Sequence, residues 1–347
     1  MIRRAALAVP LLVLALAGCG EKQEPTAGAQ GEADELRLVL DYFPNADHAG
    51  LYAAEATGEF ERAGLDVEIN APPDPTAPLK LLRAGRADIV LSYEPELLLA
   101  RDKGAEDLIA VGALVQRPLT SLVALPGGGI RSAGDLAGKR VGTAGIAYQS
   151  AYLKTILERA GVDAGSVRET GVGFDLVRPL ITGRVDATLG AFWNYEGTDL
   201  ERRGRDPVIL RMDELGVPTY NELVFVARRE DFDADGASRI RRFLQATARG
   251  HNALRRDPTT GIDALLDASS GLDRGLQTAV VEATLPVFFP KDEERTFGWQ
   301  DPAEWDAYGR WMEANGLLTR PPNAARALTN EFLPGEGLDP GIAELEE

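Results

Sequence analysis

The chain has 347 residues, 44% of them hydrophobic, and a formal net charge of −17. That length can form two domains, and the hydrophobic content is sufficient for their cores. The acidic balance argues against nucleic acid as a partner, because nucleic-acid binding needs a basic surface. Beyond the N-terminal apolar run, no segment is long and apolar enough to span a membrane.

The N-terminus has the pattern of an export signal. Arg3 and Arg4 precede an apolar run at 5–17, and the sequence "LAGC" ends at Cys19, the single cysteine of the chain. A positive start, a short apolar stretch and small residues before a cleavage site are typical of a secretory signal peptide. "LAGC" also resembles the lipobox of bacterial lipoproteins. We therefore expect a lipoprotein signal peptide at 1–18 and a lipidated Cys19 that anchors the protein to the cell membrane, outside the cytoplasm. The alternative is an ordinary signal with an incidental cysteine.

Residues 19–35 contain no apolar periodicity and few large apolar side chains. Such a composition is typical of a disordered tether, which would hold a globular body close to the membrane surface. The last segment, 336–347, is expected to be an acidic tail. The globular body occupies the residues between these two segments.

Two stretches of the body share one pattern. "LLRAGRADIVLSYEPE" (81–96) and "PLITGRVDATLGAFWNYE" (179–196) each pass from a helical end through Gly-Arg-x-Asp into a short apolar strand. Glycine commonly follows a last helical turn, because it adopts positive φ without steric cost. Further strands and helices are expected around both stretches, with strands at 36–43, 65–70, 139–145 and 167–172 and helices at 48–64 and 148–161. Each half is therefore expected to be a β-α-β-α-β lobe with a mostly parallel sheet.

The β-rich segments 117–126 and 220–229 bracket the second half, and we interpret them as two crossings between the lobes. The predicted fold is α/β, with residues 36–120 plus 226–335 in the first lobe and 121–225 in the second. Ligands of open α/β sheets bind beyond the carboxyl ends of the strands, so the strand-end loops of both lobes should face one cleft. Closing such a cleft is a hinge motion.

The expected strand-end loops carry aromatic residues beside polar ones, a combination more typical of pocket walls than of core. These rings include Tyr42, Tyr93, Tyr148, Trp193 and Tyr195. Glu196 is the candidate that orients a ligand, because a carboxylate accepts two adjacent donors, and an aminated nitrogen heterocycle offers such a pair when its ring nitrogen is protonated. One alternative is that Glu196 is solvated at the start of a helix. Another is that Glu94 or Glu96 is the carboxylate that binds the ligand.

Four motifs, in this order, resemble a known family: "DYFPNADHAGLYAA", "GRADIVLSYEPE", "GRVDATLGAFWNYE" and "GVPTYNELVFVA". They are similar to the thiamine-pyrimidine branch of the NMT1/THI5-like solute-binding proteins of ABC importers. The resemblance implies a type II periplasmic-binding fold that delivers a small ring compound, such as formylaminopyrimidine, to a membrane permease. It also implies that the ligand contacts Trp193, Asn194, Tyr195 and Glu196. Tyr42 stands where the family's D-W-x-P-N opening usually has tryptophan.

We therefore expect a monomeric binding protein without catalytic residues, cofactor or metal. His48 and His251 are the only histidines, and with no cysteine in the mature chain they form no plausible metal cluster. Asn45 or Asp47 is expected to cap a helix that has His48 in its first turn. The candidate ligand-binding residues are Tyr42, Asn45, His48, Ser92, Tyr93, Glu94, Tyr148, Trp193, Asn194, Tyr195 and Glu196.

The main alternative from another class is the eukaryotic hydroxymethylpyrimidine synthase of the same superfamily. It resembles a binding protein that consumes its own histidine and a lysine-bound pyridoxal phosphate. Its lysine and histidine correspond to Ser92 and Glu96 here, and its cysteine-rich run is absent. Without a lysine amine no Schiff base forms. Among binding proteins, a riboflavin-type ligand also suits the aromatic residues, whereas a sulfonate or nitrate needs arginine or backbone donors.

Overall fold

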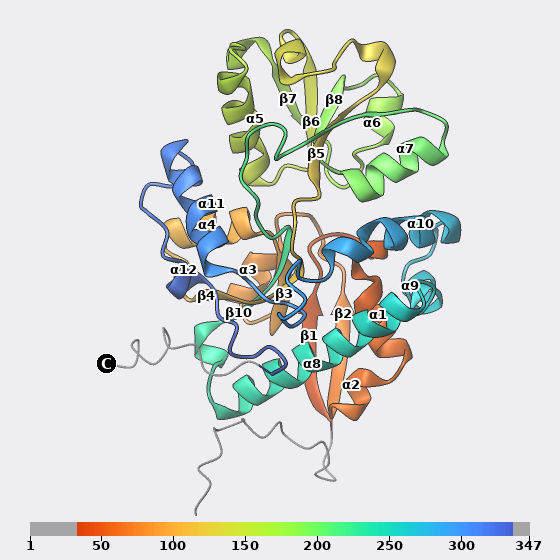
Figure 1. Ribbon diagram of the computed structural model, residues 1–347, viewed down its shortest axis with the longest axis vertical. Coiled ribbons are helices and arrows are strands. Elements are labelled where there is room, and N and C mark those ends of the chain that lie inside the picture. The colour runs from red at the N-terminus through yellow and green to blue at the C-terminus, as the bar shows by residue number, and fades with distance from the viewer. Residues whose placement is uncertain (1–32, 336–347) are drawn as a thin grey trace, which may run out of the picture.

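The computed structural model describes residues 33–335, which form two α/β lobes stacked along the long axis of the molecule (Figure 1). The expected signal peptide, Cys19, nearly all of the tether and the acidic tail lie outside the described residues. No helix in 33–335 combines the length and hydrophobicity that a membrane span requires.

The first lobe is built on a five-stranded sheet of order β2-β1-β3-β10-β4. Its strands are β1 (Asp34–Val39), β2 (Leu65–Asn70), β3 (Ile89–Ser92), β4 (Leu108–Val115) and β10 (Leu223–Arg228). The first three pair in parallel, and β10 runs antiparallel between β3 and β4. Leu38, Val90 and Val226 are fully buried in this sheet.

The second lobe repeats that arrangement with the order β7-β6-β8-β5-β9. Its strands are β5 (Thr120–Ala124), β6 (Arg140–Thr143), β7 (Arg168–Gly171), β8 (Ala187–Phe192) and β9 (Val208–Arg211). Here β7, β6 and β8 are parallel, and β5 is antiparallel to both β8 and β9. The expected duplication is therefore present in the sheets themselves.

Helices cover both sheets, and most of them belong to the first lobe. That lobe carries α1 (Ala49–Ala56), α2 (Glu59–Arg62), α3 (Pro78–Arg83), α4 (Glu94–Asp102), α8 (Ala234–Arg256), α9 (Ile262–Ala268), α10 (Arg274–Thr284), α11 (Pro302–Ala314) and α12 (Ala324–Ala327). The second lobe carries α5 (Ala147–Arg159), α6 (Arg178–Ile181) and α7 (Thr198–Arg202). The helix expected at 48–64 is interrupted at Gly58, whose φ of 70° ends α1 and begins α2.

The Gly-Arg-x-Asp pattern builds the same local structure in both halves. Gly85 and Gly183 each have a φ of 67° after a helix. The aspartate that follows forms a bidentate pair with an arginine on the neighbouring strand. Arg37 Nη2 lies 2.9 Å from Asp88 Oδ1, and Arg140 Nη2 lies 2.7 Å from Asp186 Oδ1. Bidentate pairs of this kind fix geometry as well as charge, so each aspartate holds two parallel strands in register.

Two segments cross between the lobes, 116–119 and 212–222, and one carboxylate joins them. Glu222 Oε2 accepts the backbone N–H groups of Leu119 and Thr120 at 2.6 and 2.8 Å. Its Oε1 accepts the Thr120 hydroxyl at 2.7 Å. Because β10 pairs with β4 along its whole length, the chain has already returned to the first lobe at Leu223, before the boundary expected at 226.

Candidate functional site

A small cavity lies between the lobes, and its walls come from the ends of strands in both sheets. We call this cavity the inner chamber. The first lobe supplies Asp41, Tyr42, Phe43, Asn45, Asp47, His48, Tyr93 and Leu223. The second lobe supplies Ala144, Ile146, Tyr148, Gln149, Leu176, Gly190, Phe192, Tyr195 and Glu196. This is the position that the strand-end rule predicts.

A hydrogen-bonded triad forms the wall on the first lobe. His48 Nδ1 accepts the backbone N–H of Asn45 at 3.2 Å, so the ring's other nitrogen carries hydrogen and donates to Asp41 Oδ1 at 2.9 Å. Tyr93 donates its hydroxyl to Asp41 Oδ2 at 2.7 Å. Asn45 caps the turn by accepting the N–H of Asp47 at 2.9 Å, as expected. Asp41 thereby fixes the position of two side chains that face the chamber.

On the second lobe, an irregular strand end directs Glu196 into the chamber. Gly190 is skipped in the pairing of β8 with β5, which is a bulge, and its φ is 102°. The next turn, Trp193–Gly197, is π-helical, a form often found at functional sites. Glu196 Oε2 accepts the N–H of Phe192 at 2.7 Å. Burial raises the pKa of Glu196 to about 8, because a carboxylate is poorly solvated there and Asp47 adds repulsion.

Gln149 is a polar wall residue whose place depends on Gly190. Its Oε1 accepts the N–H of Ala144 at 2.8 Å. A Cβ on residue 190 would lie 2.2 Å from Gln149 Nε2. The missing side chain of Gly190 therefore makes room for the Gln149 amide at the chamber.

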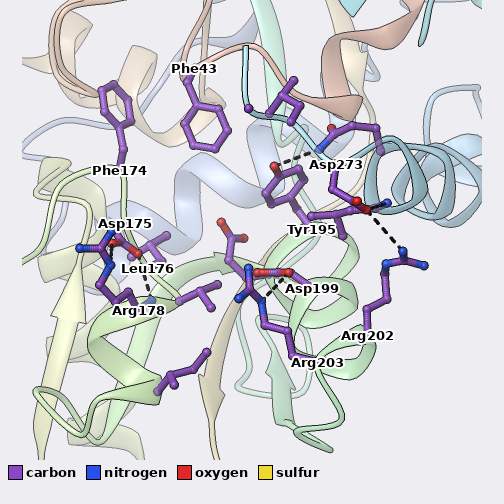
Figure 2. Close-up of a pocket in the computed structure, with 17 residues that line it drawn as sticks. Phe43, Phe174, Asp175, Leu176, Arg178, Tyr195, Asp199, Arg202, Arg203 and Asp273 are labelled. Atoms are coloured by element: carbon purple, nitrogen blue, oxygen red, sulfur yellow. Dashed lines mark hydrogen bonds and ion pairs between the residues drawn. The ribbon is translucent and has the colours of Figure 1, made fainter. Parts of the chain in front are cut away.

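Rings from both lobes meet at the outer end of the chamber. Tyr42 and Phe174 are in edge-to-face contact, with centroids 4.5 Å apart, and the Tyr42 hydroxyl donates to the carbonyl of Phe174. The ring centroid of Phe43 lies 6.1 Å from the ring centroids of both Phe174 and Tyr195. Figure 2 shows Phe43, Phe174 and Tyr195 converging beside an open groove. These rings separate the inner chamber from that second cavity, which we call the outer groove.

The two cavities differ in volume. The inner chamber has a free volume of about 20 Å³, whereas the outer groove has about 890 Å³. A free volume of that smaller size holds about one water molecule. A six-membered ring therefore enters the chamber only when the aromatic walls rotate or the lobes separate.

The two cavities also differ in charge. The residues that line the inner chamber include the acids Asp41, Asp47 and Glu196 but no lysine or arginine. Arginines line only the outer groove, where Arg203 pairs with Asp199 at 2.7 Å and Arg202 lies 3.4 Å from Asp273 (Figure 2). The chamber thus favours a ligand that presents hydrogen-bond donors rather than an anion.

The structure brings seven of the eleven candidate residues together at the chamber: Tyr42, Asn45, His48, Tyr93, Tyr148, Tyr195 and Glu196. The other four, Ser92, Glu94, Trp193 and Asn194, do not line the chamber, and their side chains have other partners. Ser92 donates to Glu96 Oε2 at 3.0 Å, one helical turn away. Glu94 Oε2 accepts both the backbone and the side-chain N–H of Asn221, at 2.7 and 2.8 Å.

Trp193 and Asn194 are turned to other partners by the π-helical turn. The indole of Trp193 donates to the carbonyl of Pro118 at 3.1 Å, and the guanidinium of Arg211 lies 4.2 Å from its ring centroid. Asn194 donates to Asp47 Oδ1 at 2.5 Å. Both residues therefore support the turn that carries Tyr195 and Glu196.

Several chamber and groove residues were missed as candidates: Asp41, Phe43, Asp47, Gln149, Leu176, Gly190, Phe192 and Phe174. Most of them adjoin candidates within the same strand-end loops, so the loops were found but not every side chain. Phe174 follows β7, and applying the strand-end rule to that strand would have identified it. Among residues 33–335 no group of three or more His, Cys, Asp or Glu side chains is arranged to hold a metal ion.

The chain is similar in sequence to several known proteins. The family model described as "NMT1/THI5 like" matches residues 45–260. A formylaminopyrimidine-binding protein of Halalkalibacterium halodurans is 32% identical over 322 residues, which cover 92% of this chain and 96% of that protein. A 4-amino-5-hydroxymethyl-2-methylpyrimidine phosphate synthase of Legionella pneumophila is 26% identical over 302 residues, covering 86% of this chain and 92% of that protein.

A solved structure confirms the predicted fold. The alkanesulfonate-binding protein SsuA from Xanthomonas axonopodis pv. citri, bound to MOPS, superimposes with a TM-score of 0.65. The match covers 86% of this chain and 99% of that chain at 21% sequence identity. This likeness establishes the two-lobed periplasmic-binding fold.

Proposed function

Because the chain belongs to the NMT1/THI5-like family, we propose that it is the substrate-binding protein of an ABC importer and that it captures a thiamine pyrimidine precursor of the formylaminopyrimidine type. The protein acts outside the cytoplasm, held to the membrane through a lipid on Cys19, and passes its ligand to a membrane permease. The observation that carries the ligand assignment is Glu196, a buried carboxyl group in a chamber lined by rings and by no lysine or arginine.

The ligand's ring lies between aromatic side chains of the two lobes. Tyr42 and Phe43 approach from the first lobe and Tyr195 from the second. Ring contacts of this kind contribute roughly 0.5–1.5 kcal/mol each beyond buried area. Micromolar binding needs about −8 kcal/mol, so directed polar contacts supply a necessary part.

Glu196 provides that direction. The carboxyl group pairs with a ring nitrogen and the adjacent exocyclic amine of an aminopyrimidine through two parallel hydrogen bonds. The backbone N–H of Phe192 holds this carboxyl group in place by donating to Glu196 Oε2. The Gln149 amide, and the triad of Asp41, His48 and Tyr93, offer further polar contacts to the ring's substituents.

We assign no enzymatic activity to the chain. Ser92 and Glu96 stand at the positions that correspond to the synthase's lysine and histidine, and the two side chains are hydrogen-bonded to each other. No lysine lines the inner chamber, so a Schiff base with an aldehyde cofactor has no amine there. A family member in which this chemistry operates needs a different residue at 92.

A thermal-shift screen tests the proposal. We expect formylaminopyrimidine and 4-amino-5-hydroxymethyl-2-methylpyrimidine to raise the melting temperature and an alkanesulfonate to leave it unchanged. Glu196→Ala should remove most of the shift, whereas Glu201→Ala, an exposed glutamate on the adjoining α7, should retain it. Stabilisation by the sulfonate alone, or an unaltered shift in Glu196→Ala, would contradict the ligand assignment.

Riboflavin is included in the same screen as the second candidate class of ligand, because the chamber's rings also suit a flavin. A single pyrimidine ring already needs the walls or the lobes to move, and the three fused rings of a flavin need a much wider separation of the lobes, so we expect no shift from riboflavin. Mass spectrometry of the same mixtures should recover every compound unchanged. Turnover of a pyrimidine would instead support the synthase alternative.

A further inference from the structure

Helix α10 belongs to the first lobe but contacts the second lobe along one of its faces. Its N-cap Asp273, Gln277 and Thr284 each meet a residue of the second lobe. Positions 273, 277 and 284 are separated by four and seven residues, a spacing that places them on a single helical stripe. Figure 1 shows α10 directly beneath α7, at the boundary between the lobes.

The innermost of these contacts is a buried polar cluster. Asn194 Nδ2 donates to Asp47 Oδ1 at 2.5 Å and to the Thr284 hydroxyl at 2.6 Å. Thr284 Oγ1 also lies 3.2 Å from the same Asp47 oxygen. Because Asn194 comes from the second lobe and both partners come from the first, the cluster exists only while the lobes are together.

The two outer contacts are progressively more exposed. Gln277 Nε2 donates to the Tyr195 hydroxyl at 3.3 Å, in a half-buried position. Arg202 and Asp273 lie 3.4 Å apart, with side chains 46% and 69% exposed. Exposed ion pairs of this kind stabilise little. The strength of the contact is therefore concentrated at Thr284, farthest from solvent.

The contacts of Thr284 and Gln277 fall on the π-helical turn that carries Glu196, whereas Arg202 lies at the end of the adjoining α7. Asn194 and Tyr195 are held by α10, and Glu196 follows them directly. Thr284 itself lines neither the inner chamber nor the outer groove. It therefore affects a ligand only through the turn and the closure of the lobes.

We propose that α10 is a latch that fixes the Trp193–Gly197 turn when the lobes close, and that Asn194 and Thr284 are its positioning residues. This inference rests on the proposed function for its effect on a ligand, but its structural part does not depend on which ligand binds. Asn194, which holds the lobes together, and Glu196, which binds the ligand, belong to the same turn. Ligand binding and closure of the lobes are therefore coupled. Ligand release requires the Asn194 cluster to break.

Hydrogen exchange of the ligand-free protein tests the structural part. Thr284→Val removes the hydroxyl with little change of shape, and we expect amide exchange in the Trp193–Gly197 turn to rise about fivefold, the effect of losing one net hydrogen bond. Thr278→Val on the same helix is the matched control, because Thr278 donates only to the carbonyl of Arg274. Thr284→Ser, which keeps the hydroxyl, should exchange as the wild type does. Equal exchange in Thr284→Val and Thr278→Val would overturn the latch.

Stopped-flow tryptophan fluorescence with formylaminopyrimidine tests the coupling. Thr284→Val should increase the dissociation rate about fivefold while the association rate stays the same, and Asn194→Ala should increase dissociation further. If Thr284→Val unfolds, Gln277→Leu replaces it, with a smaller increase expected. An unchanged dissociation rate refutes the latch. Absence of binding by the wild type would instead refute the proposed ligand, and the exchange comparison would still decide the latch.

Discussion

Glu196 Oε2 accepts the backbone N–H of Phe192 at 2.7 Å, so the side chain folds back onto the strand end from which its own turn begins. This bond orients the carboxyl group without a cation. Burial, with added repulsion from Asp47 and Asp199, raises the pKa of Glu196 to about 8. At neutral pH the chamber therefore presents a carboxylic acid that both donates and accepts.

The protonation of Glu196 predicts how binding depends on pH. A neutral aminopyrimidine and a carboxylic acid share one proton between ring nitrogen and carboxyl group. Above the pKa of about 8 that proton is lost, so affinity should fall about tenfold per pH unit. Calorimetric titrations between pH 6.5 and 9.5 measure the change. Affinity that increases with pH would show that the carboxylate is the binding form.

Substitution of Glu196 separates the two forms. Glu196→Gln keeps one donor and one acceptor side by side, so it should bind within about tenfold of the wild type and lose the pH dependence. Glu196→Ala leaves the ligand's polar edge unpaired and should cost about 2–5 kcal/mol. Calorimetry on both variants gives the comparison. Equal weakening by glutamine and alanine would exclude the neutral-acid form.

The Tyr42 hydroxyl joins the two lobes at the outer end of the chamber by donating to the carbonyl of Phe174. Tyr42→Phe keeps the ring contact and removes that bond. We expect ligand dissociation to become about three- to tenfold faster, measured by stopped-flow fluorescence. Tyr52→Phe on α1, within the first lobe, should leave the rate unchanged.

Glu94 predicts a decrease of stability with increasing pH. Burial raises its pKa from 4.5 to about 8. When folding raises the pKa of an acid, protonation stabilises the folded state. This stabilisation is complete below the pKa of the unfolded state and is lost as the pH rises through the pKa of the folded state. The free energy of unfolding should therefore fall between about pH 5 and 8, and urea denaturation at several pH values will show it.

The variant Glu94→Gln isolates this residue's share. It retains an acceptor for the Asn221 N–H groups and has no proton to lose. At pH 8.5 it should be more stable than the wild type by up to about 5 kcal/mol, because each pH unit between 4.5 and about 8 corresponds to about 1.4 kcal/mol. Glu61→Gln, an exposed change on α2, serves as the control and should alter stability little. A lower stability of Glu94→Gln at that pH would refute the prediction.

We expect Glu222, which joins the two segments that cross between the lobes, to stabilise the folded protein. Its carboxyl group accepts the backbone N–H groups of Leu119 and Thr120. Glu222→Ala leaves both buried donors unpaired, and we expect a loss of about 3 kcal/mol in the free energy of unfolding. Glu222→Gln should cost less, because its amide oxygen can still accept those donors. Denaturation by urea measures both, and equal losses would contradict this role.

Local sequence patterns predicted much of the architecture. The repeated Gly-Arg-x-Asp segments indicated two similar halves, and in both the aspartate binds an arginine of the next strand. Asn45 or Asp47 was expected to cap the turn that contains His48, and Asn45 does so. These features depend on backbone dihedral preferences and on partners within one supersecondary unit, which short sequence patterns record.

The direction of individual side chains in "FWNYE" was not predictable in the same way. Trp193 was expected to face the ligand, but it points to Pro118 and Arg211, whereas Tyr195 and Glu196 reach the chamber. The bulge at Gly190 and the π-helical turn break the alternation of a regular strand, so position along the chain no longer gives orientation.

The sequence by itself therefore determined the family, the duplicated lobes and the loops that meet at the cleft, because these follow from local patterns and from motifs in a fixed order. Tertiary structure alone decided that Asn194 binds Asp47 and Thr284, which lie 147 and 90 residues away along the chain. It also decided that Glu196 is buried without a cation. Both outcomes depend on the packing of two lobes against each other, and contacts between distant segments leave no mark in either segment's own pattern.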